Sequence, residues 1–288
     1  MKKLPIFLAA LFMAATGACS KAEKRVPQSN RVAESILAPA LLLDKEEIAK
    51  YVSDFPHADY QIFDVAGIGK FYLDDNPALV KKQLRAGKPW EPEALELFSK
   101  YAVPGSTALD IGAHIGSLTL PLARSVGPDG IVYAFEPQKK IYRELVKNLE
   151  LNSVNNAVPL RFAVGAQHLV IEMTPTQGRD GTMQVGAGGD KAEMRSIDSF
   201  VFSNVSMMKI DVEGYELPVL KGARRTIRKW HPAILIEIPG FYHYKTLPAK
   251  QKEQIDGVRS FFEQNGYRLR FAYDAGEPHF FALYKQNQ

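Results

Sequence analysis

Acidic side chains stand at or just after the ends of several apolar runs in this sequence. They are Asp110, Glu136, the pair Asp211 and Glu213, and Glu237. Each run is typical of a β-strand, and in an open α/β sheet ligands bind beyond the carboxyl ends of the strands. Carboxylates at that edge can accept hydrogen bonds from ligand hydroxyls or take up a proton. A purely structural role, in which an acid caps a neighbouring helix N-terminus, explains any one of them more easily than the whole set.

Two glycines four residues apart follow the first of these acids. Gly112 and Gly116 lie in the segment TALDIGAHIGSLTL, residues 107–120. Glycine lets the backbone turn tightly and approach a ligand closely. A dinucleotide fingerprint would need GxGxxG at this place, whereas the chain has GxxxG. The segment therefore predicts a strand and a helix joined by a turn, which either binds a ligand other than a dinucleotide or only connects the two elements.

Glu136 stands about 24 residues after Gly112. This is near the interval at which an acid reaches back to the hydroxyls of a ribose. A carboxylate accepts hydrogen bonds from both hydroxyls and would repel a ribose phosphate. The spacing favours a cofactor of the adenosine type.

The acids depend for their positions on an alternation of predicted strands and helices that begins near residue 107. After that first strand we predict strands at residues 131–135, 158–164, 169–173, 206–210 and 233–236, with a terminal pair at 267–271 and 280–284. Helices are predicted at 78–86, at 139–151, after residue 214 with Leu217, Leu220 and Ile227 on its apolar face, and at 251–264. Strands separated by helices indicate a parallel sheet. We predict an α/β fold, with a mostly parallel central sheet flanked by helices and an antiparallel terminal strand.

Two further segments lie outside this alternation. Residues 61–74 alternate around two glycines and predict a hairpin. Residues 174–190 are rich in glycine and predict a flexible loop of the kind that often covers a site.

Composition limits the classes of partner. The 288 residues include 36 basic and 32 acidic ones, a formal net charge of +4, which is too balanced to indicate a nucleic-acid-binding protein or a polybasic membrane patch. Cys19 is the only cysteine, so an intramolecular disulfide, a cysteine nucleophile and a cysteine metal site are all excluded from the folded body.

The first nineteen residues have the zones of an export signal. Lys2 and Lys3 precede an apolar stretch at residues 4–15, which is followed by small residues and Cys19. The segment TGAC resembles the lipobox of bacterial lipoproteins, although Thr16 stands where that motif prefers Leu. We expect Cys19 to carry lipid, with an uncleaved anchor or a plain signal peptide as the alternatives. A processed chain would lie lipid-anchored in the cell envelope on the periplasmic side, and an unprocessed one would be cytoplasmic or membrane-associated.

We divide the chain into four parts. They are a signal peptide at 1–19, a flexible tether at 20–35, a helical and hairpin extension at 36–105, and the α/β domain at 106–288.

Several segments together resemble a known family. ALDIGAHIGSLTL, AFEPQKKIYRELVKNLELN, RFAVG and MKIDVEGYELPVLKGA, in this order and spacing, are similar to class I S-adenosylmethionine-dependent methyltransferases of the FkbM family. The resemblance runs from about Gly87 to Glu237 and implies a Rossmann-like class I methyltransferase fold. RSIDSF, residues 195–200, resembles a short strand before the last of these motifs.

The resemblance also implies a cofactor site. It places S-adenosylmethionine against Asp110, Gly112, His114, Gly116, Glu136, Ala163 and Val164. Glu136 would hold the ribose hydroxyls, and Ala163 with Val164 would flank the adenine. Asp211 would lie near the sulfonium and the acceptor. His114 departs from many relatives, which have Asn there, and a lone histidine is more often structural than catalytic.

The resemblance favours O-methylation of a hydroxyl on a small molecule or a glycan. Asp211, Glu213 and Glu237 are the acids best placed to orient that hydroxyl or act as the base, and we expect no metal. Glu213 could instead cap the helix that starts near Tyr215. An exported enzyme would need a supply of cofactor outside the cytoplasm, so an exported nucleoside- or metabolite-binding lipoprotein that uses the same cleft without catalysis is the alternative function. An envelope interaction protein with a decayed site is a third, which the retained acids and glycines argue against.

Overall fold

A computed structural model describes residues 60–175, 183–185 and 190–287. The predictions for the signal segment, Cys19, the tether and the first part of the extension concern residues outside that described part. Within it, no helix is both long enough and apolar enough to cross a membrane.

Seven strands form the main sheet, in the order β12-β13-β11-β10-β3-β4-β5. The strands are β3 (Thr107–Ile111), β4 (Ile131–Phe135), β5 (Ala157–Leu160), β10 (Val205–Ile210), β11 (Ala233–Glu237), β12 (Tyr267–Asp274) and β13 (Pro278–Tyr284). The pairs from β11 to β5 are parallel, whereas β13 runs antiparallel to both β11 and β12. The predicted α/β fold, with a mostly parallel sheet and an antiparallel terminal strand, is confirmed.

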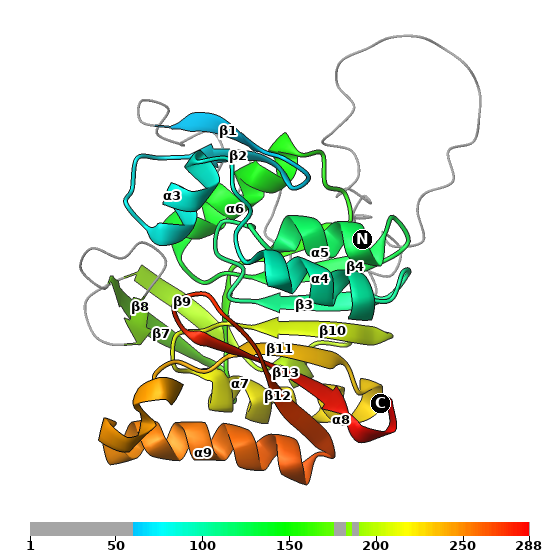
Figure 1. The fold of residues 1–288 in the computed structure, drawn as a ribbon, viewed down its shortest axis with the longest axis vertical. Coiled ribbons are helices and arrows are strands. Elements are labelled where there is room, and N and C mark those ends of the chain that lie inside the picture. The colour runs from blue at the N-terminus through cyan, green and yellow to red at the C-terminus, as the bar shows by residue number, and fades with distance from the viewer. Residues whose placement is uncertain (1–59, 176–182, 186–189, 288) are drawn as a thin grey trace, which may run out of the picture.

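Helices cover both faces of this sheet (Figure 1). One group is α4 (Pro92–Tyr101), α5 (Thr119–Val126) and α6 (Lys139–Leu151), and the other is α7 (Glu216–Gly222), α8 (Arg224–Trp230) and α9 (Ala249–Gln264). Every residue of β3 and β4 is buried, as expected for central parallel strands covered on both sides.

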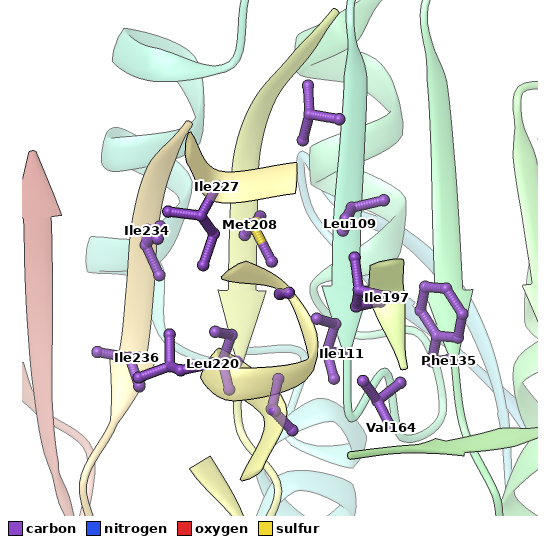
Figure 2. Packing of buried hydrophobic residues seen from close by; sticks show 14 of the residues in the cluster. Leu109, Ile111, Phe135, Val164, Ile197, Met208, Leu220, Ile227, Ile234 and Ile236 are labelled. Carbon is purple, nitrogen blue, oxygen red and sulfur yellow. The ribbon is translucent and has the colours of Figure 1, made fainter. Parts of the chain in front are cut away.

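The core on the α7–α9 side shows how the strands are stacked. Figure 2 shows Leu109, Met208 and Ile234, from the adjacent strands β3, β10 and β11, on the same side as Leu220 and Ile227 from the covering helices. All five side chains are buried. This packing holds the three strands, and with them the residues at their carboxyl ends, in a fixed relation.

The N-terminal extension packs on α6. The predicted hairpin is confirmed as β1 (Gln61–Val65) and β2 (Gly69–Leu73), and the predicted helix as α3 (Leu79–Arg85). The buried Lys81 Nζ lies 2.7 Å from Asp74 Oδ1 and 2.8 Å from Glu144 Oε2, which joins α3 to α6. The boundary that we place at residue 105 stays a prediction.

The single strand predicted at 158–164 is wrong. The structure has two strands there, β5 and β6 (Phe162–Val164), which join different sheets. β5 pairs with β4 at the edge of the main sheet, and β6 pairs with β9 (Asp190–Arg195). An apolar run in the sequence does not reveal which strand its backbone hydrogen-bonds to. The switch of the chain from one sheet to the other at Arg161 therefore has no signal in the sequence.

A second sheet of four strands, in the order β6-β9-β7-β8, lies beside the first. β7 (Leu169–Pro175) confirms a predicted strand, but β8 (Met183–Val185) falls inside the predicted loop at 174–190. Its antiparallel pairing with β7 overrides a glycine-rich composition that favours a loop. Likewise, the short strand expected at RSIDSF is wrong, because β9 ends at Arg195 and Ile197–Ser199 form a 3-10 turn.

The helix predicted after residue 214 is divided into α7 and α8 at Ala223. Gly222 packs so closely on the turn after β6 that a Cβ atom there would lie 2.0 Å from the Gly165 carbonyl oxygen.

Candidate functional site

The cleft forms where the chain leaves the sheet in two directions. β3 has β4 on one side and β10 on the other, so the connections after β3 and β10 diverge above the carboxyl edge. Gly112 follows β3 with a φ of 82°, and a Cβ atom on it would lie 1.7 Å from the Asp211 carbonyl oxygen after β10. Only glycine fits at this position, so the residue type that first indicated a ligand turn is required by the packing of the two strand ends.

A cavity of about 610 Å³ opens at this edge. Among its lining residues are Gly112, His114, Glu136, Ala163, Val164, Asp211, Glu213 and Glu237. These eight predicted site residues come from widely separated parts of the chain, and the structure brings them together. Two others do not line the cavity. Asp110 is buried in β3, where it accepts a hydrogen bond from Thr119 Oγ1 at 2.6 Å, and Gly116 packs against Leu145 of α6.

The Glu136 side chain is held at the cavity by two backbone N–H groups, those of His114 and Gln138. We call this arrangement the Glu136 cradle. The carboxylate of Glu136 accepts the His114 N–H at 3.1 Å on one oxygen and the Gln138 N–H at 2.9 Å on the other. Burial raises the pKa of Glu136 to about 8, although both amide bonds favour the charged form. His114 has a φ of 50°, a left-handed conformation in which Asn and His are enriched among non-glycine residues. This backbone geometry aims its N–H group at Glu136.

Lys209 is buried on the floor of the cleft and joins both strand ends. Its Nζ donates a hydrogen bond to the Gly112 carbonyl at 2.7 Å and lies 3.2 Å from Asp211 Oδ2. Asp110, its partner in the β3–β10 register, is 3.6 Å away through Oδ1. Neighbouring carboxylates, Asp211 first, raise the pKa of Lys209 despite its burial, so the lysine is charged at neutral pH.

Asp211 and Glu237 form a carboxyl pair at the ends of adjacent strands. Burial works to raise the pKa of Asp211, but the Lys209 ammonium and a hydrogen bond with Glu237 outweigh it and lower the pKa below its ordinary value. Burial and then the charge of Asp211 raise the pKa of Glu237 far above its ordinary value. At neutral pH the proton therefore resides on Glu237, which donates to the Asp211 carboxylate.

Glu213 lines the same cavity but is exposed and has a φ of 54°. At the start of α7 the Gly214 N–H donates to Glu216 Oε1 at 2.8 Å. Burial raises the pKa of Glu216 to about 7. This bond ties the Glu216 side chain to the turn before α7, whose N-cap residue Tyr215 makes no side-chain cap hydrogen bond.

Comparison with known protein families identifies the family to which this chain belongs. Residues 110–269, more than half of the chain, match the model of the methyltransferase FkbM domain. The chain belongs to this family. The FkbM domain therefore includes the strand-end acids, the glycine turn and Lys209, and the family places the chain among methyltransferases.

Two curated relatives have similar sequences. Hexuronic acid methyltransferase AglP of Haloferax volcanii is 26% identical over 154 residues, which cover 51% of this chain and 62% of the relative. Methyltransferase 1 of Beauveria bassiana is 24% identical over 145 residues, which cover 41% of this chain and 58% of the relative. The chain thus spans about three fifths of the length of these relatives.

Solved structures are more distant from this FkbM domain. The FkbM methyltransferase from Methylobacillus flagellatus has a TM-score of 0.43 at 20% identity, covering 65% of this chain and 50% of that one. A S-adenosylmethionine-dependent O-methyltransferase from Thermotoga maritima has a TM-score of 0.44 at 12% identity, covering 78% of each chain.

Sequence reasoning missed part of the site in this FkbM domain. Lys209 was the most important omission, and its signal is a lysine two residues before Asp211, which places both on one side of a strand. Trp90 also lines the cavity. Behind the Asp211–Glu237 pair, the buried His279 stands opposite Glu237 in the β11–β13 register, where no local pattern marks it.

Proposed function

We propose that this FkbM domain transfers a methyl group from S-adenosylmethionine to a hydroxyl oxygen of a small molecule or a glycan. The observation that carries the proposal is that one cavity has the Glu136 cradle in its wall and the Asp211–Glu237 carboxyl pair on neighbouring strand ends. The Glu136 cradle suits binding of an adenosine group, and the carboxyl pair suits removal of a proton from an acceptor hydroxyl.

The residues of the cradle fit the adenosyl part of the cofactor. Each oxygen of the Glu136 carboxylate accepts one backbone hydrogen bond and keeps a lone pair for a ribose hydroxyl. Ala163 and Val164 contribute an apolar strand to the wall beyond it, which suits an adenine ring. A cavity of about 610 Å³ is within the usual range for a cofactor and part of a second ligand.

The acid pair fits the acceptor end. When bound, S-adenosylmethionine supplies a methyl group on a positively charged sulfur, which an acceptor oxygen can displace directly. Asp211 is charged and can accept the hydroxyl proton as the new bond to carbon forms. Glu237 holds a proton that fixes the orientation of the Asp211 carboxylate. Lys209 keeps Asp211 ionised between turnovers.

A glycan is included among the acceptors for two reasons. The name of the Haloferax volcanii relative assigns it a hexuronic acid as substrate. In this chain, Trp90 lines the cavity, and the large, partly polar surface of a tryptophan side chain suits contact with a sugar ring.

We further propose that the chain is a lipoprotein anchored through Cys19 and faces the periplasm. The support is the order of the first nineteen residues, two lysines, an apolar stretch and small residues before the single cysteine.

Calorimetry with S-adenosylmethionine and with S-adenosylhomocysteine tests the cofactor assignment. We expect binding of both, weakened at least tenfold in Glu136→Gln, which keeps the shape but loses the charge. An absence of binding at millimolar ligand would refute the methyltransferase proposal for this chain.

Transfer of labelled methyl groups to hydroxylated acceptors, including a hexuronic acid glycoside, separates catalysis from binding alone. Asp211→Asn should bind the cofactor and lose at least a hundredfold in turnover, since a general base contributes about 10²–10⁴. Cofactor binding without transfer to any acceptor in the panel, in both proteins, would favour the alternative of a binding lipoprotein.

A further inference from the structure

A compact basic surface lies on the second helix group, away from the cavity. Five exposed cations and one acid line an open hollow of about 540 Å³, and they are Lys221, Arg224, Arg225, Arg228, Lys229 and Asp198. We call the five cations the α8 basic surface, because four of them belong to α8 and the fifth to the end of α7.

Asp198, the acid in the hollow, already accepts three hydrogen bonds from the start of α8. The Asp198 carboxylate accepts the Arg225 N–H at 2.7 Å, and it accepts the N–H and the hydroxyl of Thr226 at 2.8 Å each. Asp198 thus caps the start of α8 and is held there by three hydrogen bonds. Its charge offsets at most one of the five positive charges around it.

Neutral groups hold the cations in place. Arg228 Nε donates to the amide oxygen of Asn265 at 2.8 Å, and the Arg225 guanidinium donates to the Asp198 backbone carbonyl. Arg224 lies over the ring of Phe261 at 5.7 Å from its centroid. None of the five cations takes part in an ion pair within the described residues. Cations gathered and oriented in this way repel one another, and an external anion would relieve that repulsion.

The α8 basic surface lies at the opposite end of the sheet from the cavity. α8 ends at Trp230 and β11 begins at Ala233, so the helix reaches the amino ends of the strands, whereas the cavity opens at their carboxyl ends. In Figure 1, α8 lies beside the C-terminal end of the chain, in agreement with the stacking of His231 on Tyr284. A partner bound here would leave the cavity open.

We propose that the α8 basic surface docks on the phosphate headgroups of an anionic membrane. Two guanidinium groups can bind phosphate oxygens in a bidentate way, and Arg225 and Arg228 are already oriented. Lys229 lies 4.6 Å from the centroid of Trp230, a half-buried aromatic of the type found at membrane surfaces. The apolar stretch before Cys19 would bring the chain to such a surface. Docking by α8 would then turn the cavity away from the lipid.

Vesicle partitioning of the full chain with Cys19→Ser, which cannot take a lipid, tests this docking. The readout is the ratio of partition coefficients for vesicles of phosphatidylglycerol and of phosphatidylcholine, because the apolar N-terminal stretch contributes to both. We expect a ratio above about 10 at 0.1 M salt, since each cation near an anionic surface adds to the attraction.

The decisive comparison is between two triple variants in that background. Lys221→Gln/Arg224→Gln/Lys229→Gln removes three charges that make no hydrogen bond to an acid, so folding is retained, as a thermal melt would verify. Lys82→Gln/Lys88→Gln/Lys100→Gln removes three exposed charges elsewhere. The first should lower the ratio about tenfold or more and the second should not. Equal ratios for the two variants would overturn the proposal.

A soluble phosphate distinguishes a lipid headgroup from a phosphometabolite as the ligand of this surface, because both present the same phosphate group. Titration of the Cys19→Ser chain with glycerol 3-phosphate should show no saturable binding below about 10 mM that depends on the α8 basic surface. Tight binding of the soluble phosphate that the first triple variant abolishes would instead identify a phosphometabolite site, and the membrane proposal would be wrong.

Discussion

Lys209 and Asp211 lie on one side of the end of β10, with the Lys209 ammonium nitrogen 3.2 Å from Asp211 Oδ2. The same nitrogen is bonded to the Gly112 carbonyl at the end of β3. One buried charge therefore sets both the position of the glycine turn and the ionisation of the acid that faces the cavity. The adenosine end and the acceptor end of the cleft are linked through this side chain.

Replacement of Lys209 by Met should destabilise the fold. The change leaves the Asp110 and Asp211 carboxylates without their cation, and breaking a buried pair costs about 3–5 kcal/mol. Urea denaturation at pH 7 measures this loss. Lys100→Met is the matched control, because Lys100 is exposed and lies over the Tyr101 ring, and it should cost less than about 1 kcal/mol. Equal costs for the two variants would show that Lys209 does not hold the strand ends together.

Gly112→Ala should damage the site more than its backbone strain alone explains. Both Gly112 and Gly105 have positive φ values, 82° and 77°, but a Cβ atom at Gly105 would meet nothing within 4 Å. Gly105→Ala should therefore cost about 1–2 kcal/mol from the left-handed conformation alone. Gly112→Ala adds a clash with the Asp211 backbone and should also weaken S-adenosylhomocysteine binding at least tenfold. Calorimetry on both variants checks this, and equal affinities would contradict it.

Sequence reasoning located most of the cavity because parallel strands carry their carboxyl ends to one edge. Each acid needed only a recognisable apolar run before it, and Glu136, Asp211 and Glu237 followed such runs. The same reasoning placed Asp110 too near the cleft. Asp110 is within β3 instead of beyond it, and its hydrogen bond to Thr119 holds it beneath the cavity floor.

The features that sequence reasoning missed depend on contacts between distant segments. Lys209 was treated as one residue of an apolar strand, because its partners near residue 110 are about a hundred positions away and periodicity does not give strand register. The change of sheet at Arg161 was missed for the same reason. The separation of α7 from α8 was missed as well, and the close packing of Gly222, the last residue of α7, on Gly165 is likewise a contact between distant segments.

Cys19→Ser should abolish lipid labelling in cells if the chain is a lipoprotein. The thiol is the only group that could carry the lipid, because the chain has no other cysteine. Metabolic labelling with a fatty-acid analogue, followed by isolation of the chain, measures the effect. Ser20→Ala, which leaves the thiol in place, is the control and should retain the label. Persistent labelling of Cys19→Ser would exclude the proposed anchor.

Glu136 should make both stability and cofactor affinity depend on pH, with opposite signs. Its pKa is raised from 4.5 to about 8, so between these values the folded chain binds more protons than the unfolded chain. The contribution of Glu136 to the free energy of unfolding should therefore be full below about pH 4.5 and be lost as the pH rises to about 8. Glu136→Gln stays neutral, so its stability relative to the unchanged chain should increase from pH 5 to pH 9, as urea denaturation at each pH would show. Glu216, which shares this direction, is present in both proteins and cancels in the comparison.

Cofactor affinity should follow the other direction, because ribose hydroxyls donate to the charged carboxylate. At pH 6 the unoccupied chain has Glu136 largely protonated, so binding must release a proton, and the affinity should rise about tenfold for each pH unit until about pH 8. Calorimetry of S-adenosylhomocysteine binding in buffers of different ionisation enthalpy would detect that proton, and Glu136→Gln should show neither the release nor the rise. A pH-independent affinity in the unchanged chain would mean that Glu136 does not bind the ribose, whereas a rise that persists in Glu136→Gln would assign the titration to another group.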